Sequence, residues 1–145
     1  MKQQSLINKK KLKEIDQSKK MHLIKNFSLS LDKLYEEGFV HGDINRKNII
    51  YSENKLFLVD FEPSLLQLKD KTKQWMSTRP YRHHEDIQNN NITAKSDFLG
   101  FACFVKWFLF NRKYPQYYTE ECSKIITKLK FQSSPFKNLT KLLVS

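Results

Sequence analysis

The chain has 145 residues, of which 39% are hydrophobic and 13% aromatic, and its formal net charge is +11 at pH 7. The length suits one domain, and the apolar content with only three Gly and four Pro excludes a disordered chain. Two cysteines are too few for a disulfide framework, and the longest apolar run, residues 98–110, is too short to cross a bilayer.

The first segment in chain order, residues 1–20, is basic, with seven Lys against Glu14 and Asp16. Residues 124–145 add five Lys and no acid. Two interpretations stay open: solvated helix faces with a loose N-terminal arm, or a patch for an acidic protein, a nucleic acid or a membrane surface. Lysine without interleaved arginine and aromatic residues weighs against nucleic acid. We expect only a short helix in this segment, no secretory signal, and an intracellular, cytoplasmic protein.

The domain itself is expected to span residues 21–145, after this basic segment. Apolar side chains recur at helical spacing over residues 21–37 and Gly38 follows them, which predicts a helix that ends there. Two short apolar runs within residues 48–61, joined by a turn at residues 52–54, predict a β-hairpin.

The second half is expected to be helical after an irregular stretch over residues 64–94. Residues 98–110 are apolar on nearly every face, which predicts a buried central helix. Two amphipathic segments follow, around residues 122–131 and 136–144. The predicted fold class is therefore α+β, mainly α-helical, with a small hairpin.

Chemistry-bearing residues gather in the loop before the hairpin and at its far end. Asn48 ends that loop, and Asp60 follows it by twelve positions. The hairpin would place both on one rim, with Asp43 one loop away, and carboxylate and amide oxygens suit Mg²⁺. The remaining carboxylate would orient a hydroxyl nucleophile and take its proton. Asp and Asn also cap turns, which is the alternative interpretation.

The pattern His-x-Asp-x4-Asn followed by Asp-Phe-x resembles the catalytic loop and metal-binding motif of the protein kinase superfamily. Residues 78–85 resemble the end of the kinase activation segment, and residues 95–102 resemble the start of the central kinase helix. The resemblance covers about residues 23–110. It implies the C-terminal, catalytic lobe of a Ser/Thr kinase.

The resemblance implies a role for each matching residue. Asp43 would be the catalytic base, and Asn48 and Asp60 would bind Mg²⁺ together with ATP. Asn45 stands where Ser/Thr kinases place a phosphate-contacting lysine, so Arg46 or Lys47 would supply the cation. Thr78 would lie in the substrate-accepting loop. Three residues would be structural: His41 beneath the catalytic loop, Glu85 at the end of the activation segment, and Asp97, which would brace the catalytic loop.

The chain also departs from the kinase pattern. Gly42 replaces the arginine that reads a phosphorylated activation loop in many kinases, so we expect ordering without that phosphorylation. Glu62 replaces the glycine after Asp-Phe, and Ala102 replaces a common glycine of the central helix. About 40 residues precede the catalytic loop, without a Gly-rich loop, a Val-Ala-x-Lys lysine or its helix glutamate. Without an N-lobe, water is not excluded and autonomous catalysis should be weak or absent.

Four hypotheses about function follow. We rank first an enzyme that transfers the ATP γ-phosphate to a Ser/Thr hydroxyl of a protein substrate, completed by a partner's lobe. The second is a catalytically inactive lobe that binds a partner kinase as decoy, scaffold or regulator. The others are a fragment of a longer kinase and a small-molecule phosphotransferase. Residues 83–86 are of metal-ligand types, but adjacent ligands rarely converge on one ion.

Overall fold

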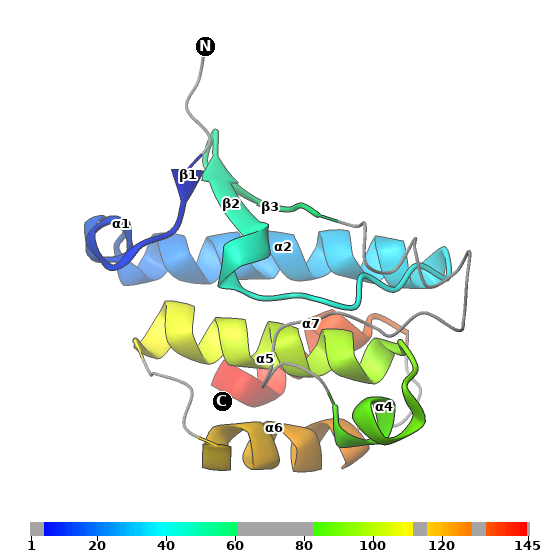
Figure 1. Cartoon of the computed structure of the whole chain (residues 1–145). Coiled ribbons are helices and arrows are strands. Elements are labelled where there is room, and N and C mark those ends of the chain that lie inside the picture. Colours follow the sequence, from blue (N-terminus) through cyan, green and yellow to red (C-terminus); the bar gives the residue numbers. More distant parts are fainter. Residues whose placement is uncertain (1–4, 61–82, 112–115, 129–132, 145) are drawn as a thin grey trace.

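The computed structural model describes residues 5–60, 83–111, 116–128 and 133–144. Within these ranges the protein is mainly helical, with one small antiparallel sheet, so the α+β class is confirmed (Figure 1). The elements are β1 (Ser5–Leu6), α1 (Lys9–Glu14), α2 (Gln17–Glu36), the 3-10 turn η1 (Arg46–Asn48), β2 (Ile49–Ser52), β3 (Lys55–Leu58), α4 (His84–Asn89), α5 (Ala94–Phe110), α6 (Gln116–Lys128) and α7 (Pro135–Val144).

The predicted hairpin is present as β2 and β3, and β1 adds a strand that the sequence did not predict. Ser52 pairs with Lys55, so the turn has two residues rather than the three expected. Its residues, Glu53 and Asn54, have φ of 52° and 61°. Two successive positive φ values mark the turn type whose twist matches a tight hairpin, which explains why Ser52 stays in the strand.

The basic N-terminal segment is packed rather than loose, which corrects the expectation of a loose arm. Ile7, Leu12 and Ile15 are buried in the main core. Asp16 caps α2 by accepting a hydrogen bond from the Lys19 backbone N–H at 2.8 Å. The helix therefore begins at residue 17, before the apolar pattern starts, and it runs across the proposed domain boundary at residue 20.

Helix α5 is the centre of the fold, and Figure 1 shows it between α2 and α6. Every residue of its stretch 99–105 is buried. It begins at Ala94, four positions before the predicted start, because its first turn is polar and is capped by Thr93. No helix in the described ranges combines the length and apolar character needed to cross a membrane.

Two further boundaries differ from the sequence prediction. Helix α4 occupies part of the stretch expected to be irregular, and six residues with mixed polarity give too little periodicity to detect. Helix α6 begins at residue 116, six positions earlier than expected. Helix α7 starts within one residue of its predicted range.

Asp32 of α2 holds the start of α7 in place. Its buried carboxylate accepts hydrogen bonds from the backbone N–H groups of Phe136 at 2.7 Å and Lys137 at 3.2 Å. The first N–H groups of a helix have no partner within it, so Asp32 acts as a cap supplied from another helix. Burial raises the pKa of Asp32 although both N–H groups oppose this.

Candidate active site

The loop after α2 is fixed from below by a buried carboxylate of α5. Asp97 accepts hydrogen bonds from the backbone N–H groups of His41 and Gly42, both at 2.8 Å. Gly42 has φ of 90°, where a larger side chain would be strained. Asp97 is only 4% exposed, and this burial raises its pKa to about 7 against the opposing effect of the two N–H groups.

Gly100, one turn further along α5, lets the helix touch the same loop. A Cβ atom at this position would lie 2.2 Å from the Ile44 carbonyl oxygen. Ile44 is itself buried, so the loop cannot easily move away. Sequence reasoning did not single out Gly100, although a glycine inside a strongly apolar helix indicates close backbone approach.

His41 lies buried beneath the loop and ties it to the end of β3. Its Nδ1 accepts a hydrogen bond from the Asp43 backbone N–H at 3.0 Å, so its Nε2 donates to the Val59 carbonyl at 2.8 Å. These partners select one neutral tautomer. Burial lowers the pKa of His41, which favours the same neutral form.

Two amide side chains hold the Asp43 carboxylate. Asn45 Nδ2 donates to Asp43 Oδ1 at 3.0 Å, and Asn48 Nδ2 donates to Asp43 Oδ2 at 3.1 Å. Both amides also donate to the Asp43 backbone carbonyl, at 3.1 and 2.8 Å. Because Nδ2 of Asn48 faces Asp43, its Oδ1 points elsewhere, and no described residue donates to that oxygen.

Asp60 directly follows Val59, whose backbone connects the end of β3 to the catalytic loop. The Val59 N–H donates to the Asn48 carbonyl at 2.8 Å, while the Val59 carbonyl accepts from His41. Asp60 has φ of 63° and an exposed side chain. Aspartate tolerates this left-handed conformation better than most residues. The chain thus turns at Asp60, one residue beyond the backbone hydrogen bond between Val59 and Asn48.

The cations of the loop have different surroundings. Asn45 is buried and its side chain is used within the loop, since its Oδ1 accepts from the Lys47 backbone N–H at 2.8 Å. The Arg46 guanidinium lies 5.3 Å from the centre of the Trp107 ring. The Lys47 side chain is exposed, and no acidic group of the described ranges forms an ion pair with it. Thr78 lies outside the described residues, as do Phe61 and Glu62.

The segment that ends in Glu85 is attached to the start of α5. Glu85 forms an ion pair with Lys95. The buried carboxylate of Asp86 accepts hydrogen bonds from the hydroxyls of Thr93 and Ser96, both at 2.7 Å. Asp86 was missed because both partners lie beyond the helix that carries it. The ligand atoms of residues 83–85 do come within 4.8 Å of one another, but Glu85 is already engaged and we assign no metal there.

Comparison with known protein families identifies the family of the chain. The family model described as the protein kinase domain matches residues 1–142. The chain therefore belongs to the protein kinase domain family. No curated protein matches the chain.

Proposed function

We propose that the chain is a kinase catalytic lobe that transfers the γ-phosphate of ATP to a Ser or Thr hydroxyl. The observation that carries this proposal is the shared hydrogen-bond network of Asp43 and Asn48. Val59 links this network to Asp60 through the Asn48 carbonyl. A turn-capping role would not require a second acid beside these residues.

The residues fit Mg²⁺ with ATP as the bound group. Asn48 has an amide oxygen without a donor among the described residues, and Asp60 has an exposed carboxylate. Mg²⁺ prefers such oxygen ligands and retains positions for phosphate oxygens. In the proposed site Asn48 and Asp60 hold the ion. When bound, Mg-ATP supplies the phosphoryl group and neutralises the charge that develops on it.

The chain's own residues then prepare the acceptor hydroxyl. Asp43 is the proposed base: its carboxylate accepts the hydroxyl proton, and the amides of Asn45 and Asn48 keep it in one orientation. Lys47 is the loop cation available for phosphate, because Arg46 lies over an aromatic ring. His41 and Asp97 are positioning residues that fix the backbone on which Asp43 is carried.

A partner that covers the nucleotide completes this proposal. No Gly-rich loop or strand lysine appears in the sequence, and these parts normally shield the phosphates from water. Thr78 is the proposed contact to the substrate. We expect slow transfer by the chain alone and faster transfer with a lobe supplied by another protein.

The test is transfer of radiolabelled phosphate from ATP to a Ser/Thr-rich acceptor protein. Asp43→Asn keeps the size of the side chain and removes the base, so we expect incorporation to fall by about 10²-fold or more. Asp16→Asn, at an exposed helix cap, is the matched control and should retain full activity. Equal incorporation by wild type and Asp43→Asn would contradict the proposed role.

A further inference from the structure

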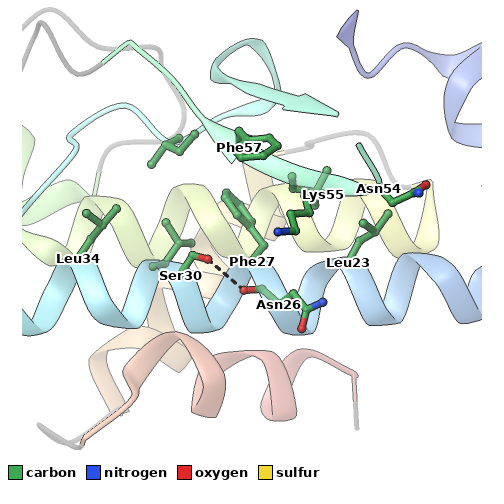
Figure 2. Close-up of a pocket in the computed structure, with 11 residues that line it drawn as sticks. Leu23, Asn26, Phe27, Ser30, Leu34, Asn54, Lys55 and Phe57 are labelled. Atoms are coloured by element: carbon green, nitrogen blue, oxygen red, sulfur yellow. Dashed lines mark hydrogen bonds between the residues drawn. The ribbon is translucent and has the colours of Figure 1, made fainter. Parts of the chain in front are cut away.

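A groove of about 480 Å³ lies between α2 and β3. One face of α2, from Leu23 to Leu34, forms one wall, and residues 54–58 form the other (Figure 2). Apolar side chains dominate both walls, and Phe57 is left 42% exposed. None of Asp43, Asn48 and Asp60 lines this groove.

The groove follows the edge of the sheet that β3 forms. Successive side chains of a strand point to opposite faces, yet five consecutive residues, 54–58, line this one hollow. A groove on one face of the strand would contact only every second residue, so a groove lined by five consecutive residues runs along the edge of β3. The strand order β1-β2-β3 agrees, because it leaves β3 unpaired on its outer side among the described residues.

The register shows which backbone groups face outward. Ser52 and Lys55 flank the two-residue turn, so they form the hydrogen-bonded pair closest to it. Phe57 is the next residue of β3 bonded to β2, and Leu56 and Leu58 direct their N–H and C=O groups away from the sheet. These groups have no backbone partner among the described residues. They form a template for one further strand.

The charge of the groove selects the kind of strand. Among the described residues, Lys55 is the one charged residue in the lining, and none of those residues is acidic. Lys19 lies at the hairpin end, where its Nζ donates to Asn54 Oδ1 at 2.8 Å. An incoming segment with acidic residues is therefore favoured over a basic one.

We propose that this groove binds an extended acidic segment of a partner protein, which adds to β3 as a fourth strand. Its backbone pairs with Leu56 and Leu58, alternate apolar side chains enter the groove, and its acidic residues face Lys55 and Lys19. Main-chain bonds supply affinity in this mode and the side-chain pockets supply specificity. The proposal does not depend on phosphoryl transfer, so loss of one activity leaves the other measurable.

The probe is a fluorescein-labelled synthetic nonapeptide of alternating Val and Glu, titrated with the full chain and followed by fluorescence anisotropy. Two control peptides share its length: one has Lys in place of Glu, and the other has Pro at alternate positions to remove the N–H groups needed for pairing. We expect the Val-Glu peptide to bind at least about tenfold more tightly than either control.

Paired variants locate the binding surface. Ser30→Trp fills the groove and should weaken binding at least about tenfold, whereas Leu29→Trp places the same side chain on the exposed neighbouring position outside the lining. Lys55→Glu should weaken binding about fivefold, with the exposed Lys25→Glu as its control. Circular dichroism checks each fold, and Lys55→Glu keeps the test valid if Ser30→Trp unfolds.

The outcomes divide clearly. Loss of binding in Ser30→Trp and Lys55→Glu, with retention in both control variants, supports strand addition in the groove. The proposal is overturned by equal binding of the proline peptide, by tighter binding of the lysine peptide, by equal effects of each variant and its control, or by no detectable binding.

Discussion

The substitution Asp97→Asn tests how the buried carboxylate supports the catalytic loop. Asp97 accepts two backbone N–H groups, while its burial raises the pKa from 3.8 to about 7. The folded state therefore binds a proton more tightly than the unfolded state does. Stability from this group is fully present below pH 3.8 and is lost as the pH rises to about 7.

The magnitude follows from the two pKa values. Raising the pKa from 3.8 to about 7 corresponds to at most about 4 kcal/mol, since each pKa unit is worth about 1.4 kcal/mol. Asparagine does not titrate, so this pH dependence should be absent from Asp97→Asn. Its amide still accepts one N–H and leaves the other unpaired, which costs about 1–3 kcal/mol at every pH.

Urea unfolding of both proteins between pH 4.5 and 8, followed by tryptophan fluorescence, measures this difference. Titration of other groups, including His41, largely cancels in the comparison of the two proteins. We expect the difference in free energy of unfolding, wild type minus Asp97→Asn, to shrink steadily as the pH rises. A difference that grows with pH would refute the reasoning, because the two N–H groups would then outweigh burial and lower the pKa.

Three further substitutions have definite expected outcomes. Gly100→Ala forces Cβ against the Ile44 carbonyl and should destabilise the fold by about 2 kcal/mol or more in urea unfolding. Unchanged or raised stability, as expected for Gly→Ala at an exposed helical position, would contradict the close approach. Asp32→Ala leaves the buried Phe136 N–H and the part-buried Lys137 N–H of α7 without their cap and should cost about 2 kcal/mol, against about 1 kcal/mol for Asp16→Ala at the exposed cap of α2. Lys47→Ala should lower phosphate incorporation about tenfold and leave the free energy of unfolding unchanged, and the control Lys25→Ala should change neither quantity. Equal incorporation rates for the two variants would remove Lys47 from the site.

The features predicted well from the sequence depend on neighbours in the chain. The hairpin follows from two short apolar runs and a turn, which is a local pattern. Asp43 and Asn48 are five positions apart, so one short loop carries both side chains. Family membership could also be inferred, because the motif spacing is itself local.

The features that escaped prediction join distant segments. Asp32 contacts a helix that lies 104 residues away, and nothing in the amphipathic pattern of α2 distinguishes its carboxylate from a solvated one. Gly100 matters because of a loop 56 positions earlier in the sequence. The contact between Asp97 and the loop was expected only through the kinase resemblance. Helix starts were displaced because the caps at Asp16 and Thr93 precede the apolar pattern.

The central claim is that Asn48 and Asp60 hold Mg²⁺ with ATP next to Asp43, and calorimetry tests it most directly. The full chain is titrated with ATP in the presence and absence of Mg²⁺, and the titrations are repeated with Asp60→Asn and with the control Asp16→Asn. We predict ATP binding that requires Mg²⁺, is weakened at least about tenfold by Asp60→Asn, and is unchanged by Asp16→Asn. No binding at millimolar nucleotide, or binding indifferent to Mg²⁺ and to Asp60, would contradict the claim and favour a lobe that only binds a partner.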